Sequence, residues 1–163
     1  MSSSATIRMP DLAAQRAAME KLGFLAGSWA GEAQVLAGAG SPLTLDWSEE
    51  AHFKLDGLLL AIEARGVSRS DGRVVRQALG LVAYDDFAGA YRMRTFNDGR
   101  FLETELKLLD GEDAFSWGFE VGEFKTSSVL RMNEKGEWTE VHHLTVGSQP
   151  ARKLMELKVA RRG

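Results

Sequence analysis

The chain has 163 residues, of which 44% are hydrophobic and 26% charged, and its formal net charge is -3. These proportions are typical of one globular domain with a real core, and they exclude the low hydrophobicity and high net charge of a disordered chain. Nucleic acid is not an expected partner, because the charge balance lacks the excess of Lys and Arg that neutralises phosphates. Cysteine is absent, which excludes disulfides and thiolate sites.

The sequence contains no segment typical of a membrane span or an export signal. No run of 18 apolar residues occurs, and residues 1–10 lack the apolar core of a signal peptide. We therefore expect no membrane span and a cytoplasmic location. Residues 1–10 are small and polar, which predicts a flexible N-terminus.

A short amphipathic helix is predicted over residues 11–25, where Leu12, Met19 and Leu22 recur at roughly helical spacing. Asp11 is suited to cap this helix, because its carboxylate can accept hydrogen bonds from the free amides of the first turn. Gly27 follows the expected end of the helix.

Beyond the helix the hydrophobic period changes to two. Between residues 43 and 55 most odd positions are apolar, as at Leu45, Trp47 and Phe53, and the even positions are polar. This alternation is typical of a strand with one buried face. It recurs down the chain, and turn signals such as Asp56-Gly57 separate the runs. About ten strands are predicted, near residues 28–36, 43–56, 58–67, 74–84, 90–97, 100–109, 113–121, 124–132, 137–146 and 152–161.

Such a meander must bury its single apolar face, and closure into a barrel also removes the exposed edge strands. The predicted fold class is therefore all-β, a closed antiparallel β-barrel of about ten strands with a short N-terminal helix, formed by residues 11–163. A sandwich of two sheets is the main alternative.

A family resemblance rests on the segment Leu25-Ala26-Gly27-Ser28-Trp29-Ala30-Gly31-Glu32, which follows the helix and opens the first strand. It resembles the Gly-x-Trp start of lipocalin-like (calycin) barrels, and it is most similar to nitrobindin-type domains and to an uncharacterised bacterial lipocalin-like family. The likeness extends to Tyr84-Asp85, to Glu137-Trp138-Thr139-Glu140 and to the closing strand 153–162. It implies a lipocalin-like fold over most of residues 20–162.

Nitrobindin-type domains bind haem through a histidine on their last strand, and the chain departs from that pattern. Ala33 stands where those domains have a further glycine, and the last strand begins Ala151-Arg152-Lys153-Leu154 without a histidine. Haem bound by that route, and with it an activity on nitrogen oxides, is therefore disfavoured. The cofactor stays unknown.

Strand parity places a few polar side chains on the apolar face. A buried carboxylate is costly unless it is paired or protonated, so these side chains could form a hydrogen-bonded cluster that anchors a ligand. The alternative is that a bulge shifts the register and turns them to solvent. The candidates are Glu49, Thr126, Ser128, Glu140 and His142.

Metal and catalytic motifs are not found. His142 and His143 are adjacent and point to opposite faces of a strand, so a two-histidine metal site is not expected. His142 alone could ligate an iron, act as a base or be a satisfied structural residue. No nucleophile elbow, Walker loop, dinucleotide fingerprint or zinc motif occurs, so the chain is not favoured as an enzyme.

Aromatic side chains could line an apolar cavity or simply fill the barrel. Arg92 and Arg94 share one strand face, where they either bind a ligand carboxylate inside or, as is favoured, lie in solvent. The aromatic set is Trp47, Phe53, Tyr91, Phe101, Phe115, Trp117, Phe119, Phe124 and Trp138.

The favoured function is a binding module for a small apolar or amphipathic molecule, with Glu49, Glu140 and His142 as anchors and Trp47 and Trp117 beside them. One alternative is a haem-binding nitrogen-oxide sensor or enzyme that uses His142. Another is a structural or oligomerisation domain without a ligand, and homodimer formation is left open.

A structural contact is predicted between the first and last strands, which are neighbours in a closed barrel. Antiparallel pairing brings Trp29 beside the end of the last strand, and parity selects Arg161 over Arg162. We expect the Arg161 guanidinium to lie over the Trp29 ring and both residues to be structural.

Overall fold

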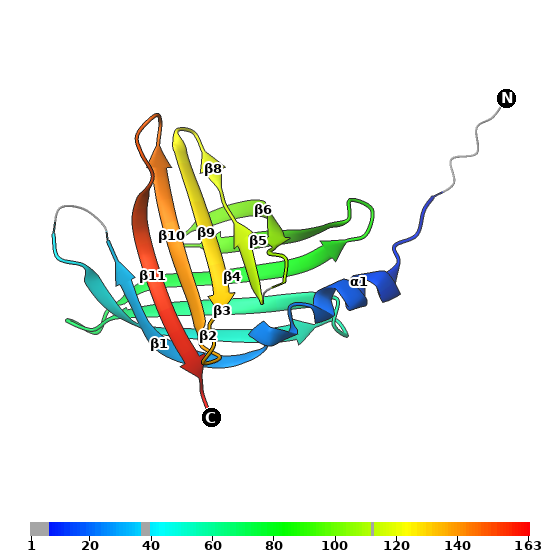
Figure 1. The fold of residues 1–163 in the computed structure, drawn as a ribbon, viewed down its shortest axis with the longest axis horizontal. Helices are drawn as coiled ribbons and strands as arrows, with labels where there is room; N and C mark the ends of the chain where they lie inside the picture. Colours follow the sequence, from blue (N-terminus) through cyan, green and yellow to red (C-terminus); the bar gives the residue numbers. More distant parts are fainter. Residues whose placement is uncertain (1–6, 37–39, 112) are drawn as a thin grey trace.

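In the computed structural model a single antiparallel sheet closes on itself, and a short helix lies at one end (Figure 1). The structure describes residues 7–36, 40–111 and 113–163. Within these ranges the elements are α1 (Leu12–Glu20), the 3-10 turn η1 (Gly23–Leu25), β1 (Gly27–Val35), β2 (Leu43–Lys54), β3 (Leu59–Ser68), β4 (Val74–Asp85), β5 (Ala90–Asn97), β6 (Arg100–Leu108), β7 (Ala114–Trp117), β8 (Glu120–Val121), β9 (Phe124–Met132), β10 (Trp138–Val146) and β11 (Arg152–Arg161).

Nearly every strand pairs with its neighbour in the chain, and the ring is completed where β11 pairs with β1. On the other side β9 pairs with β10 and also with β7 and β8, which together take the place of one strand. The result is a closed antiparallel barrel of ten strands, which confirms the predicted fold class over the two-sheet alternative.

The strand predicted over residues 113–121 is interrupted between β7 and β8. At Gly118, between them, the chain comes so close to β9 that an added Cβ would lie 2.4 Å from the carbonyl oxygen of Thr126. Two hydrogen bonds join Phe119 to Thr126, one from each backbone amide. The break therefore results from a close contact across the sheet, which the period-two pattern does not encode.

The N-terminal helix is shorter than predicted, because α1 ends at Glu20 and η1 follows. Asp11 caps it as expected, its side chain accepting from the Ala14 amide at 3.0 Å. Met19, Leu22 and Leu25 are fully buried, so the two short helices cover one end of the barrel. This end is called the closed end below, and the opposite end, with the loops at 69–73, 98–99 and 147–151, is called the open end.

Part of the predicted flexible segment 1–10 lies outside the described residues, namely residues 1–6. Residues 7–10 are exposed and lie in no helix or strand, and Arg8 contacts Asp86 at 3.6 Å. Among the described residues no helix is both long and apolar enough to cross a membrane.

Candidate functional site

A polar cluster lies on the inner face of the barrel, built from β2, β9 and β10. Glu49 alternates with the buried Trp47 and Ala51 on β2, and it pairs across the sheet with Trp29 of β1. Glu140 is paired with Leu157, a core residue of β11. Glu49 is only 3% exposed and Glu140 only 8%.

The register shift between β10 and β11 does not turn this cluster outward. It falls between His142 and His143, where Leu154 of β11 is the extra residue, and the register of β10 with β9 is continuous there. His142 therefore stays on the same face as Glu140, and Ser128 of β9 is its partner in the register.

Hydrogen bonds join the side chains of β9 and β10 into one chain. Ser128 Oγ lies 2.7 Å from His142 Nδ1, and His142 Nε2 lies 2.8 Å from Glu140 Oε2. The indole of Trp138 donates to the other oxygen, Glu140 Oε1, at 2.7 Å. A carboxylate only accepts hydrogen bonds, so toward an ionised Glu140 it is the Nε2–H tautomer of His142 that donates, and both Glu140 oxygens then have a partner.

Glu49 is in a different state. Its Oε1 accepts from the Trp47 indole at 2.6 Å, but its buried Oε2 has no hydrogen-bond partner in the part of the chain that the structure describes. Burial raises the pKa of Glu49 well above its usual value, and the negative charge of Glu140 raises this pKa further. Glu49 therefore holds its proton to higher pH than a solvated glutamate does, and one of its polar atoms is unused.

Aromatic rings surround these polar groups. The ring of Trp117 meets His142 edge-on with centroids 5.7 Å apart, and Phe115 packs on Trp117 at 5.3 Å. The ring of Trp47 fills the space above Gly66, where an added Cβ would lie 2.7 Å from it. Glycine at this position of β3 thus lets the indole come close to the backbone of the inner wall.

The closed end has its own set of contacts. Trp29 is fully buried, donates from its indole to the Leu25 carbonyl at 2.8 Å and packs edge-on against Trp138 at 5.6 Å. The Arg161 guanidinium lies 4.3 Å from the Trp29 ring centroid, as strand parity predicts. Arg161 also donates to the carbonyls of Ala26 and Phe24, at 2.5 and 3.0 Å.

Two aromatic residues of the predicted lining lie outside the barrel. Phe101 and Phe124 are both more than half exposed. Phe101 alternates with the inward-facing Leu102, whereas Phe124 shares the parity of Ser128 but is the first residue of β9, at the end of the barrel. Arg92 and Arg94 also point outward, where Arg92 pairs with Asp85 and Glu105, and Arg94 with Glu103. Neither arginine therefore serves an interior carboxylate.

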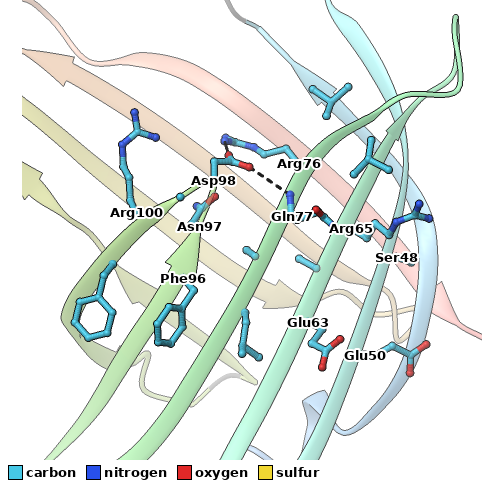
Figure 2. A pocket seen from close by; sticks show the side chains of 17 residues that line it. Ser48, Glu50, Glu63, Arg65, Arg76, Gln77, Phe96, Asn97, Asp98 and Arg100 are labelled. Atoms are coloured by element: carbon cyan, nitrogen blue, oxygen red, sulfur yellow. Dashed lines mark hydrogen bonds and ion pairs between the residues drawn. The ribbon is translucent and has the colours of Figure 1, made fainter.

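A hollow of about 810 Å³ lies along the outer face of β2 to β6 (Figure 2). Ser48 and Glu50 line it, and on β2 they alternate with inward residues. The exposed Phe96 and Phe101 meet edge-on at its margin, with centroids 5.1 Å apart. None of the predicted ligand residues borders this hollow.

One sequence signal for the site was overlooked. Trp47-Ser48-Glu49 and Trp138-Thr139-Glu140 repeat the same Trp-x-Glu spacing, and in both the indole donates to the carboxylate two residues on. Residues two apart share a strand face, so the spacing could have predicted both hydrogen bonds.

The fold and the cluster together define a closed β-barrel with a polar, aromatic-walled interior. No protein-family model matches the chain, and no curated protein matches it. Among solved structures it is similar to the crystal structure of Rv2717c from M. tuberculosis, with a TM-score of 0.67 and 13% sequence identity, over 90% of this chain and 98% of that chain. At this identity the likeness concerns the fold alone.

Proposed function

We propose that the chain is a binding module that holds a small apolar or amphipathic molecule inside the barrel. Glu49, Glu140 and His142 act as its polar anchors, and Trp47 and Trp117 as its walls. The main observation in support is that the buried Glu49 Oε2 has no hydrogen-bond partner among the described residues. Leaving a buried polar atom unpaired costs about 1–3 kcal/mol, and a ligand inside the barrel would remove this cost.

Access to the cluster supports the proposal. The His142 side chain faces inward, yet 17% of it is exposed, so the cluster is in contact with solvent. A few polar groups within an apolar, aromatic wall are the usual composition of a small-molecule site. The outer hollow also borders a buried atom without a partner among the described residues, Asn97 Oδ1, but no tryptophan lines it.

The haem alternative fits these residues less well. A haem iron needs a free nitrogen lone pair, but Nδ1 of His142 contacts Ser128 and Nε2 contacts Glu140. Ligation would break one of these hydrogen bonds and leave its partner unpaired in the interior. The proposal therefore includes no haem.

The proposal also includes a family and a cellular setting. We place the chain with lipocalin-like carriers related to nitrobindin-type domains and assign it a cytoplasmic, bacterial setting. The opening Gly27-Ser28-Trp29 supports the family assignment. Homodimer formation stays a prediction.

Binding of the neutral dye Nile red, followed by fluorescence, tests the proposal. We expect one dye molecule to bind per chain. Trp117→Ala, on the inner wall, should raise the Kd at least tenfold, about 1.4 kcal/mol. The matched outer variant Phe101→Ala should bind as the wild type does. Loss of binding in Phe101→Ala with no change in Trp117→Ala would place the dye in the outer hollow and contradict an interior site.

A further inference from the structure

The charges that face the interior are unequally placed. Four arginines occupy inward positions of the register in the described residues, and all lie at strand ends: Arg76, Arg100, Arg152 and Arg161. Arg76 is paired with Asp98, and Arg161 donates hydrogen bonds to the carbonyls of Phe24 and Ala26. The middle of the barrel therefore carries two carboxyls without an arginine or lysine beside them.

This distribution opposes an anionic ligand. The negative charge of Glu140 acts on this part of the interior, where it raises the pKa of Glu49. A carboxylate or phosphate near Glu49 would meet this charge in a poorly solvated interior, where repulsion between like charges is strong. The outward direction of Arg92 and Arg94 removes the cations that could have offset it.

The same distribution favours a cation. The free Glu49 Oε2 can accept a hydrogen bond once Glu49 loses its proton, and the field of Glu140 attracts positive charge to the same place. Indole rings attract cations through their negative faces, and Trp47 is fixed beside this oxygen by its own hydrogen bond to Glu49.

We infer that the interior site takes an amphipathic amine, whose ammonium group pairs with Glu49 while its apolar part lies against Trp47 and Trp117. This inference rests on the proposed binding function and names the ligand class. Binding exchanges one cation for another: the ammonium of the ligand pairs with the Glu49 carboxylate, and the proton that Glu49 held is released to solvent.

The titration test must distinguish proton release by Glu49 from proton release by other groups that face it. Glu140 and His142 face it from β10, and Tyr91 faces the interior from β5, whereas its direct neighbours Trp29 on β1 and Ala64 on β3 do not titrate. Release of a proton by His142 must be distinguished from release by Glu49. The variant Glu49→Gln distinguishes the two, because it removes only the Glu49 proton and keeps the side-chain shape.

Calorimetric titration with octylamine, 1-octanol and octanoate tests the inference. Measured at pH 7 in phosphate and in Tris, whose ionisation enthalpies differ, octylamine should bind at least tenfold more tightly than the other two and release about one proton. Glu49→Gln should lose both the preference and the proton release. Glu50→Gln, on the outer face beside it, should retain both.

The outcomes separate the ligand class from the binding function. Equal binding of octanol and octylamine without proton release would overturn the amine assignment and leave the binding module intact. Tightest binding of octanoate would also overturn it. Binding of none of the three would contradict both proposals. Proton release by the wild type needs no variant, so the inference is testable even if Glu49→Gln does not fold.

Discussion

At the scale of single residues, Glu49 makes stability depend on pH in an unusual direction. A carboxyl whose pKa is raised on folding binds its proton more tightly in the folded state than in the unfolded state. The contribution of Glu49 to the free energy of unfolding is therefore fully present below about pH 4.3, the pKa of a glutamate in the unfolded chain. It is lost as the pH rises from there through the pKa of Glu49 in the folded state.

We therefore predict that Glu49→Gln is less sensitive to pH than the wild type. In the window above about pH 4.3 the wild type should lose about 1.4 kcal/mol of unfolding free energy per pH unit from this group, and the variant should not. Urea unfolding at several pH values measures this difference.

Glu50→Gln is the control for that experiment. The hydrogen bond from Ser28 lowers the pKa of Glu50, so its contribution has the opposite sign and is lost as pH falls. Parallel curves for the wild type and Glu49→Gln would show that Glu49 titrates normally in the folded protein.

At the scale of elements, β1 approaches β11 very closely at Gly31. A Cβ at this position would lie 2.1 Å from the Lys158 carbonyl oxygen and 2.9 Å from Val159 Cα, both backbone atoms that cannot swing aside. Gly31→Ala should therefore destabilise the barrel by about 1–3 kcal/mol, as overpacking does. Thermal or urea unfolding measures it.

Gly23→Ala provides the matched control, since nothing lies within 4 Å of its added Cβ. It should leave stability unchanged or slightly raised, because alanine restricts the unfolded chain more than glycine does. Equal stability of the two variants would mean that β1 and β11 are less closely packed than described.

The junction of η1, β1 and β11 gives a second prediction at this scale. Trp29→Ala should cost about 3–5 kcal/mol, because it empties a fully buried aromatic position. Arg161→Ala should cost clearly less, since a cation–π contact made by an exposed guanidinium contributes about 0.5–1 kcal/mol and water can reach the carbonyls that Arg161 leaves. In chemical denaturation, a larger loss for Arg161→Ala than for Trp29→Ala would contradict the account.

At the scale of the whole molecule, much of the barrel follows from local pattern. Period-two runs and turn residues were enough to place the strands, because a half-buried strand must alternate and a hairpin needs residues that accept positive φ. Parity was also enough to place Glu49 and His142 on the apolar face. The break at Gly118 was not predictable, since it depends on a contact with Thr126 across the sheet.

The pKa shift of Glu49 could not be predicted from the sequence, because it depends on the closed barrel. Glu49 and Glu140 are 91 positions apart in the sequence, and they influence each other only because β2 and β10 line the same interior. No local pattern carries that information, although the repeated Trp-x-Glu spacing pointed to each half of the site.

The most direct test of an interior site uses the four tryptophans as reporters. In a ¹⁵N NMR titration with octylamine or 1-octanol, the indole signals of Trp47 and Trp117 should shift strongly. That of Trp29, bonded to the Leu25 carbonyl at the closed end, should shift least. If no indole signal moved while the backbone amides of Phe96 and Phe101 did, the ligand would lie in the outer hollow and the interior site would be wrong.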